Sequence, residues 1–470
     1  MKKIKVVTNI ERQILIGLIM SDSFIKKVAP ALQIELLEIP AARQVCKWVF
    51  DYFAVYKRSP KATIQDIFND KSAKLKRKEA KEWIRDFLSS ISSEYEKAGF
   101  NEELLFNRSI RYFKRQKLKK NINQIEDLLD NDEVEEAEKL WVESRKIPTS
   151  LDLGFDPTSV KIAKQLLKNE ESRISVYTGI KKLDKLVGPI KSGWLVFFMG
   201  PQKRGKTWAL LCQAVSACMQ GYNVVFISLE SEDEDIAMRF WMMLGSLVSK
   251  LSSDRNKRVV TLDFPYYSKS GDVKYKKYKR KIINQSTVIQ TLKKFNVLSP
   301  GKLIMKVFPM GSAGPIEIDT YLDSLEAYLD FDPHVILIDY LGIMKGKGER
   351  RDKYNDNSIW LKGLAQERKA AVFSGHQGRR ETLEAFNINS SDMPEDIRIL
   401  GNLDVLFGIN QTEEERLSGI TRISTLIHRH RKYSTKKQVQ LLQQLEAGQF
   451  ALDDKLVDSL ELEKEILDRD

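Results

Sequence analysis

The sequence contains few residues that could cross-link the chain or hold a transition metal. Its 470 residues include three cysteines, and no Cys-x-x-Cys pair occurs among them (Cys46, Cys212 and Cys218). Nor do the four histidines have the spacing of zinc ligands (His334, His376, His428 and His430). We therefore expect no disulfide framework, no zinc site and no zinc-ribbon primase module, and the composition is typical of a reducing cytosol.

Long apolar runs are also missing. No stretch of about 18 uncharged apolar residues occurs, so we expect no membrane span. The N-terminal sequence MKKIKVVTNIERQ begins with basic residues but reaches Glu11 and Arg12 before any apolar run of signal-peptide length. We therefore expect no secretory signal, no membrane partner and a cytoplasmic location.

Positive charge is in excess. The formal net charge is +12, the pI is about 9.2 and the hydrophobic fraction is 42%. That fraction is ordinary for a globular protein, and the length allows two or three domains. A surplus of Lys and Arg fits either a lysine-rich solvated surface or a polyanionic partner, because phosphate backbones release counterions to clustered cations. The positions of the Lys and Arg clusters along the chain distinguish these two alternatives.

Residues 1–146 are predicted to form an all-helical domain. Thr8 and Glu11 have the spacing of a capping box, and the stripe that follows is apolar at helical period (Ile10, Ile14, Leu15, Leu18 and Ile19). Two charged amphipathic segments, 103–129 and 133–145, flank the turn sequence DNDE. This pattern predicts that the domain ends in a helical hairpin.

Residues 147–175 are predicted to be a linker. Pro148, Gly154 and Pro157 interrupt regular structure, and VKIAKQLLKNEE then forms one amphipathic helix. A single amphipathic helix needs a surface that buries its apolar stripe. That surface is either the helix's own domain or a neighbouring subunit.

The pattern from residue 176 to residue 455 predicts an α/β domain. Apolar segments such as WLVFFMG, NVVFISLE and HVILIDYLGIM alternate with helical segments. Fully apolar strands alternating with helices indicate a mainly parallel sheet with helices on both faces. The remaining residues, 456–470, are predicted to be a charged C-terminal tail.

A basic insertion at 254–281 interrupts this alternation. It holds ten Lys or Arg against three Asp, with four interleaved tyrosines. Such a stretch is either a solvated loop or a contact for nucleic acid or another partner. The sequence leaves both readings open.

The segment GPQKRGKT, at 200–207, fits the spacing G-x-x-x-x-G-K-[ST] of a phosphate-binding loop. A strand precedes it and a helix follows, which is the context that such a loop requires. Its backbone N–H groups and the helix N-terminus converge on phosphate oxygens, while Lys206 reaches the β- and γ-phosphates and Thr207 ligates Mg²⁺. The predicted nucleotide-binding residues are Gly200, Pro201, Gln202, Lys203, Arg204, Gly205, Lys206, Thr207 and Trp208.

Three polar residues stand at the ends of other predicted strands. Asp339 closes VILID, where a carboxylate holds Mg²⁺ through coordinated water, and the alternative is an ordinary helix cap. Glu230 closes FISLE, where a carboxylate can deprotonate an attacking water, and the alternative is a common surface glutamate. Gln377 follows AVFSGH and is placed to sense the γ-phosphate, unless it is merely a polar strand end.

Two arginines are predicted on one face of a late strand, RISTLIHRHRK. Alternation would put Arg429 and Arg431 on one face, and His428 and His430 on the other. Two arginines on one face repel each other unless an anion lies between them. An arginine finger that reaches a neighbouring subunit's γ-phosphate meets that need, and the alternative is a pair on a solvated edge strand.

The order of these motifs resembles the hexameric DnaB-like replicative DNA helicases, including their phage members. The segments TGIKKLDKLVGPIKSGWLVFFMGPQKRGKT, SLESEDEDIAMR and ILIDYLGIM resemble the entry to the family's RecA-like motor, its glutamate strand and its Walker B signature. LKGLAQERKAAVFSGHQGRR and SSDMPEDIRILGNLDVLFGI are similar to the family's glutamine segment and to the loop before its arginine fingers.

The resemblance implies ATP and Mg²⁺ bound by Lys206, Thr207 and Asp339, with Glu230 as base and Gln377 as sensor. It also implies that Arg429 and Arg431 act in trans within a homo-hexamer. Since only a heterologous interface places one subunit's arginine in the next subunit's pocket, the linker helix then finds its surface on a neighbour. A single strand at a replication fork, 5′→3′ movement, a primase, a helicase loader and, for a phage protein, the bacterial host cytoplasm are further implications.

The family binds single-stranded DNA by loops that follow the Walker B strand and precede the last hairpin. In those loops this chain has Lys345, Lys347, Arg350, Arg351, Arg379, Arg380 and Arg398. Pro394 stands where the family usually has arginine, and Ile397 where it has glycine. Arg398 is therefore the expected substitute for that arginine.

Two other functions compete with an ATP-driven helicase. A RecA-like ring or filament ATPase without unwinding activity would share the phosphate loop, but the helical front and the Asp-Tyr-Leu signature oppose it. A scaffold or loader-like protein that uses nucleotide only to assemble is opposed by the presence of Glu230, Asp339 and Arg431.

Overall fold

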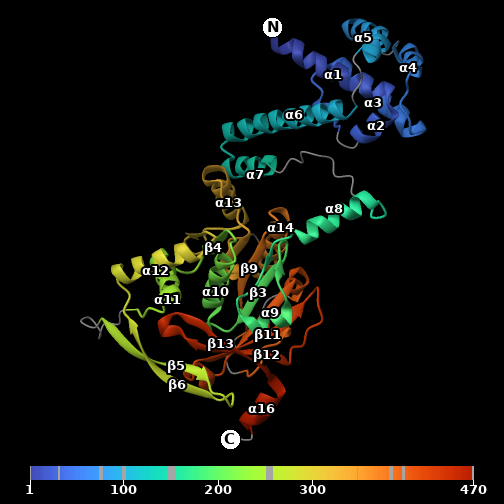
Figure 1. Ribbon diagram of the computed structural model, residues 1–470. Helices are drawn as coiled ribbons and strands as arrows, with labels where there is room; N and C mark the ends of the chain where they lie inside the picture. The colour runs from blue at the N-terminus through green and yellow to red at the C-terminus, as the bar shows by residue number, and fades with distance from the viewer. Residues whose placement is uncertain are drawn as a thin grey trace. The chain divides into compact units, whose positions relative to one another are not determined.

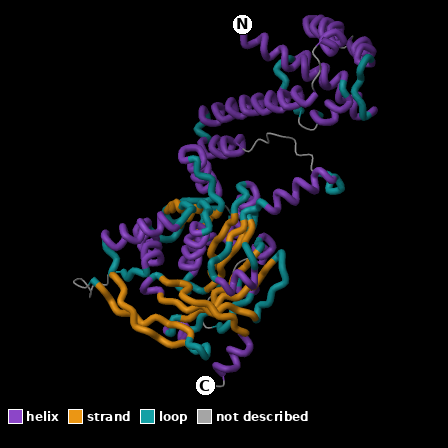
Figure 2. The backbone as a smooth tube through the Cα atoms, viewed as in Figure 1, coloured by secondary structure: helices purple, strands orange, loops and turns teal. Residues whose placement is uncertain are grey.

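The computed structural model contains two compact units, Met1–Ile162 and Ala163–Asp470. It describes residues 2–29, 32–72, 78–97, 102–145, 155–249, 258–346, 348–379, 385–393 and 397–467. Helices build the first unit, and the strands gather in the second (Figures 1 and 2).

The first unit is helical because its apolar residues recur at helical period. Its helices are α1 (Lys2–Met20), α2 (Asp22–Val28), α3 (Pro40–Tyr56), α4 (Thr63–Ser72), α5 (Lys78–Lys97), α6 (Glu102–Asp130) and α7 (Val134–Arg145). The predicted stripe of α1 forms part of the core, with Ile14, Leu15, Leu18 and Ile19 fully buried. Residues Asn131 and Asp132 turn the chain between α6 and α7, which lie in contact.

The predicted capping box at Thr8 and Glu11 is wrong. Helix α1 begins at Lys2, so Thr8 lies inside it. Glu11 is fully buried and its carboxylate serves another helix, accepting hydrogen bonds from the backbone N–H of Glu38 and Ile39 at the start of α3. The Tyr112 hydroxyl donates to the same carboxylate. A buried carboxylate needs such donors, and tertiary contacts supply them here.

The second unit is built around a nine-stranded sheet of order β13-β12-β11-β10-β3-β9-β8-β4-β7. Strands β10, β3, β9, β8, β4 and β7 are parallel, and β11, β12 and β13 extend the sheet antiparallel. The strands are β3 (Leu195–Gly200), β4 (Val224–Ser228), β7 (Leu303–Val307), β8 (Val335–Asp339), β9 (Ala371–Gln377), β10 (Val405–Asn410), β11 (Ile420–His428), β12 (Lys437–Gln444) and β13 (Gln449–Asp458).

Helices cover both faces of this sheet, which confirms the predicted α/β class. Alternate residues of β3 enter opposite cores: Val196 and Phe198 join one, and Phe197 joins the other. The first core is closed by α9 (Lys181–Val187), α10 (Lys206–Met219) and α11 (Asp233–Gly245). The second is closed by α13 (Pro315–Leu329) and α14 (Arg350–Glu367).

Over its described residues, the insertion at 254–281 is a β-hairpin and not an irregular loop. Strands β5 (Val259–Tyr267) and β6 (Val273–Lys281) pair antiparallel. Aromatic and branched residues at alternate positions favour a strand, and the Ser-Gly-Asp sequence at 270–272 supplies the turn. The helix α12 (Gln285–Leu298) follows.

The linker contains the predicted helix. Helix α8 (Val160–Glu171) spans VKIAKQLLKNEE and has no buried residue. Its side chains at Val160, Leu166 and Leu167 are 70%, 44% and 66% exposed. The predicted breakers Pro148 and Gly154 lie outside the described residues. Strands β1 (Ser175–Val176) and β2 (Ile190–Lys191) then pair beside the start of the sheet domain.

At the C-terminus the fold departs from the predicted boundary at 455/456. That boundary falls inside β13, and α16 (Ser459–Leu467) continues from it. Across the part of the chain that the structure describes, no helix is both long enough and apolar enough to span a membrane.

Candidate nucleotide site

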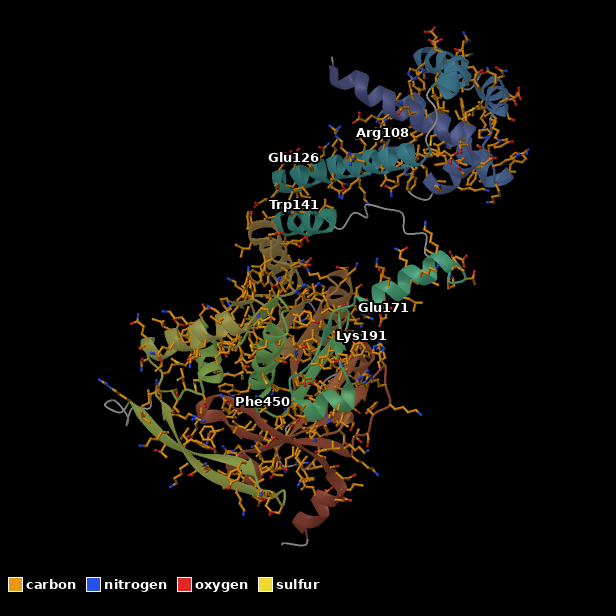
Figure 3. The ribbon with its side chains drawn as sticks, in the orientation of Figure 1. Arg108, Glu126, Trp141, Glu171, Lys191 and Phe450 are labelled. Carbon is orange, nitrogen blue, oxygen red and sulfur yellow. The ribbon has the colours of Figure 1, made fainter. Side chains whose placement is uncertain are left out.

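The loop between β3 and α10 requires its two motif glycines for different reasons. Gly205 has φ +91°, a conformation that L side chains rarely adopt, and a Cβ there would lie 3.3 Å from the ring of Phe450. A Cβ at Gly200 would lie 3.2 Å from Ile409 of the neighbouring strand β10. Figure 3 labels Phe450 on β13. The loop therefore takes its shape from both local geometry and the strands around it.

Lys206 points back across this loop. Its Nζ donates hydrogen bonds to the carbonyl oxygens of Gly200, at 3.0 Å, and Pro201, at 2.8 Å. Burial lowers the pKa of Lys206 to about 8, while the charges of Asp339 and Glu230 act in the opposite direction. The ammonium is thus held, with little solvation, where a phosphate would complete its set of acceptors.

Thr207 and Asp339 meet at the start of α10. The Thr207 hydroxyl donates to Asp339 Oδ2 at 2.8 Å, and Asp339 is 1% exposed. Burial raises the pKa of Asp339 to about 6, with Glu230 adding to the rise and the Thr207 hydrogen bond opposing it. One hydroxyl and one carboxylate beside a phosphate loop match the hard oxygen ligands that Mg²⁺ takes in nucleotide sites. The residues present therefore fit a Mg²⁺ ion.

Glu230 and Gln377 are brought beside this pair by strand ends. Strand β4 ends at Ser228, and its turn is fixed by Leu229 N donating to Asp339 O at 2.8 Å and by Ser231 N donating to Ser228 Oγ at 3.1 Å. Gln377 ends β9 opposite Gly200. Parallel strands bring their carboxyl ends to one edge of a sheet, which is why residues far apart in sequence converge.

These side chains line one cavity of about 450 Å³. Its lining residues are Gln202, Lys203, Gly205, Lys206, Thr207, Trp208, Glu230, Ser231, Arg239, Asp339, Gln377 and Leu445. Of the other predicted nucleotide residues, Gly200 and Pro201 hold Lys206, and Arg204 lies 3.4 Å from Glu413 in an ion pair. The cavity can hold a polyphosphate beside a divalent cation.

Sequence reasoning missed Arg239 and Leu445. Arg239 lies on α11, and its charge acts on Asp339 across the cavity. Six other residues of this helix are charged or contain sulfur, so nothing in the local pattern singles out Arg239. Leu445 lies in the turn between β12 and β13, where only the packing of that turn brings it to the cavity.

The predicted strand alternation of Arg429 and Arg431 is wrong. Strand β11 ends at His428, whose Nε2 is 3.0 Å from Val187 O, and the chain then turns. His430 stacks on Trp194, with ring centroids 4.3 Å apart. These two anchors take residues 429–431 out of the sheet, so strand periodicity no longer applies to them.

The two arginines line a different cavity from the phosphate loop. Its volume is about 900 Å³, and its lining includes Arg173, Lys191, Lys362 and Asp404 with Arg429 and Arg431. The Arg429 guanidinium donates to Gly401 O, and Arg431 packs against Gly188. Within one chain, therefore, the described lining of this cavity shares no residue with the nucleotide cavity.

The predicted DNA-contact residues fall in two loops that meet. Arg398, in the 3-10 helix Ile397–Asn402, forms an ion pair with Asp352 Oδ1 at 2.8 Å, which joins this loop to the start of α14. Lys345, Arg351 and Arg379 are exposed. Lys347, Arg380 and Pro394 lie outside the described residues, as does the side chain of Arg350.

Comparisons with known proteins identify the family of this chain. The model of the DnaB-like helicase C terminal domain matches residues 175–451. A DnaB-like replicative helicase of Enterobacteria phage T4 is 23% identical over 425 residues, which cover 85% of this chain and 82% of that protein. A solved DnaB-like replicative helicase, described with its interactions with primase, has a TM-score of 0.59 and 16% identity, covering 94% of this chain and 99% of that one. Because the model of the DnaB-like helicase C terminal domain matches more than half of this chain, the chain belongs to the DnaB-like helicases.

Proposed function

We propose that this chain hydrolyses ATP to move along single-stranded DNA as a homo-hexameric ring and to unwind duplex at a replication fork in the 5′→3′ direction. The observation that carries the proposal is the single cavity that holds Lys206, Thr207, Asp339 and Glu230 together. The separate position of the arginine pair supports the ring.

The geometry supports a distinct role for each residue of the cavity. The backbone N–H groups of the loop and the N-terminus of α10 bind the phosphates, and Lys206 neutralises the β- and γ-phosphate oxygens. Thr207 and Asp339 would hold Mg²⁺, which would neutralise charge on the phosphates. Glu230 is exposed and near Asp339, where it can take the proton of an attacking water, and Gln377 contacts the γ-phosphate from β9.

The arginines support hydrolysis between subunits. Arg429 and Arg431 line a cavity whose residues are distinct from those of the chain's own nucleotide cavity. A neighbouring subunit in a heterologous interface could receive them at its γ-phosphate, where guanidinium groups stabilise the charge of the transition state. The exposed apolar side of α8 gives the same neighbour a surface to bury.

The basic loops support coupling to DNA. Lys345, Arg351 and Arg379 are exposed in the segments that follow β8 and β9, the strands that carry Asp339 and Gln377. Displacement of those strand ends on hydrolysis would move the DNA contacts directly. We propose Lys347, Arg350, Arg380 and Arg398 as further contacts of the same loops, with a primase and a loader as partners in the cytoplasm of a bacterial host.

The test is the ATPase rate of the wild-type chain with and without single-stranded DNA, and again with Arg431→Ala subunits mixed into wild type. We expect stimulation by DNA and a loss of activity that exceeds the mole fraction of mutant, because each Arg431→Ala subunit disables its neighbour's site and one disabled site stops a ring whose sites act in turn. A mixture with Lys206→Ala serves as the matched case in which a subunit disables its own site.

Two results would count against the proposal. DNA-independent turnover that falls only in proportion to the mutant fraction would mean that subunits act alone, as in a simpler RecA-like ATPase. DNA-stimulated turnover without strand separation on a forked substrate would mean that the protein is a translocase and not a helicase.

A further inference from the structure

No described residue of the β5–β6 hairpin lines the nucleotide cavity. Nine residue pairs, from Val259 opposite Lys281 to Tyr267 opposite Val273, make its ladder. Isolated two-stranded hairpins are marginally stable in water. The hairpin therefore owes its order to the surface on which it packs.

That surface is the antiparallel end of the main sheet. Strand β5 contacts β12 and β13, and the side chain of Gln444 donates to Asp263 O at 2.6 Å. The Tyr267 hydroxyl donates to Gln440 O at 3.3 Å, and the Tyr275 hydroxyl donates to Ser418 O at 3.0 Å. Apart from that of Tyr275, these contacts come from β5, so β6 is the outer strand.

The outer strand carries charge of one sign. Its nine residues, VKYKKYKRK, hold five lysines and one arginine and no acidic residue. All five lysines are exposed, and none of them forms an ion pair with another described residue. Charged side chains, lysine especially, keep an exposed edge strand from pairing with another chain. Six cations of one sign on one strand also create a field that attracts a polyanion.

Exposed aromatic rings lie among these cations. Tyr266, Tyr275 and Tyr278 are 43%, 50% and 40% exposed. Lys276 Nζ lies 5.5 Å from the centroid of the Tyr278 ring, and Arg280 lies 5.2 Å from the same centroid. Proteins that bind single strands combine a cationic surface for the backbone with aromatic rings on which unpaired bases stack. A duplex hides its base faces, and an acidic polypeptide has none.

We infer that the β5–β6 hairpin binds single-stranded nucleic acid through its outer strand. This contact is separate from the loops with the predicted DNA-contact residues. Those loops follow β8 and β9 and precede β10, whereas the hairpin packs on β12 and β13. It adds a second strand contact to the proposed function and depends on charge and stacking rather than on ATP.

The experiment compares two variants of the full chain that each lose three exposed lysines. One carries Lys274→Gln, Lys277→Gln and Lys279→Gln on the hairpin. The control carries Lys293→Gln, Lys294→Gln and Lys302→Gln, which lie on α12 and just after it. Binding of a fluorescent oligothymidylate is measured by anisotropy without nucleotide, between about 50 and 200 mM salt.

We expect the hairpin variant to bind the oligothymidylate roughly 10- to 100-fold more weakly at about 0.1 M salt. The slope of log affinity against log salt should fall by about 2, because each phosphate contact to a single strand contributes about 0.7. The control variant should keep the wild-type slope. The same three positions changed to arginine should restore binding, which a folding defect would not allow.

Three results would overturn the inference. If both variants bind the oligothymidylate equally weakly, the effect comes from the net charge of the protein and not from the hairpin. Weakening confined to a duplex of equal length would assign the hairpin to duplex, and weakening confined to polyglutamate would assign it to an acidic polypeptide. The DNA-stimulated ATPase rate of the same samples separates the two proposals. If DNA stimulates the ATPase and the hairpin variant binds the oligothymidylate like wild type, only the hairpin contact is excluded. If the hairpin variant binds more weakly and DNA does not stimulate the ATPase, only the helicase proposal is excluded.

Discussion

Asp339 and Lys206 are both buried beside the nucleotide cavity, where their charged forms are less well solvated than in water. Burial raises the pKa of Asp339 from 3.8 to about 6 and lowers that of Lys206 from 10.5 to about 8. Both shifts disfavour the charged forms that nucleotide and Mg²⁺ require. The folded chain without ligand is therefore destabilised at this site, and a bound Mg²⁺–nucleotide would relieve that cost.

Asp339→Asn should stabilise the nucleotide-free protein while it removes ATPase activity. A carboxyl whose pKa is raised binds its proton more tightly in the folded state, so wild-type stability falls as pH rises from about 4 through about 6. At neutral pH the cost is at most about 3 kcal/mol, and the loss of the favourable Lys206 contact reduces the gain. Thermal unfolding should therefore show a midpoint higher by a few degrees at about pH 7 and little changed at about pH 4.

Asp356→Asn is the matched control, because Asp356 is an exposed carboxylate of α14. It should leave the unfolding midpoint and the ATPase rate near wild type at both pH values. A lower midpoint for Asp339→Asn at neutral pH would show that the Thr207 hydrogen bond outweighs the burial of charge.

At the scale of elements, the glycine loop and the turn after β12 are coupled by packing. Phe450, at the start of β13, lies against Gly205, and Leu445 lines both the nucleotide cavity and a cavity of about 490 Å³ beneath the β5–β6 hairpin. The loop conformation thus depends on strands that contribute no motif residue. Side chains added to the loop should disturb this packing as well as the backbone.

Gly205→Ala should destabilise the protein by about 1–2 kcal/mol and weaken nucleotide binding, because φ +91° is unfavourable for alanine. Gly363→Ala is the contrasting change: Gly363 lies in α14, and a Cβ there meets no atom within 4 Å. That substitution should stabilise by about 0.5–1 kcal/mol and leave binding unchanged. Denaturant unfolding and nucleotide titration of both variants check the pair, and equal effects at the two glycines would contradict the loop argument.

At the scale of the whole molecule, we propose that a neighbouring subunit buries the exposed apolar side chains of α8. Leu167 is 66% exposed, and α8 has no buried residue among those that the structure describes. Leu167→Glu should therefore shift the assembled protein toward smaller species in sedimentation, since it places a charge in the proposed subunit interface. Val297→Glu, at an 84% exposed apolar residue of α12, should leave the assembly state unchanged.

Assembly and activity should fall together for Leu167→Glu. If Leu167→Glu changes neither the sedimentation nor the ATPase rate with DNA, α8 does not lie in the subunit interface. The proposal that α8 docks on the neighbour that receives the arginines would then be wrong.

Patterns that depend on neighbours in sequence predicted much of this protein. The apolar runs that become β3, β4, β8 and β9, the stripe of α1 and the helix α8 were all recognisable, because periodicity reports burial on one face or two. The fold class and the phosphate loop followed from the same local signals. The roles of Glu230 and Gln377 stay predictions, although their convergence on one cavity was expected from the ends of parallel strands.

What the sequence could not determine depends on contacts between distant segments. The capping pattern at Thr8 failed because buried Glu11 is used by α3 and Tyr112, and Arg429 and Arg431 left the strand because His428 and His430 are anchored to Val187 and Trp194. Arg239 and Leu445 reach the nucleotide cavity only through packing. Sequence by itself determined the local chemistry and the class of fold; tertiary structure alone decided which distant side chains share a pocket, because burial and hydrogen bonding between remote elements override local periodicity.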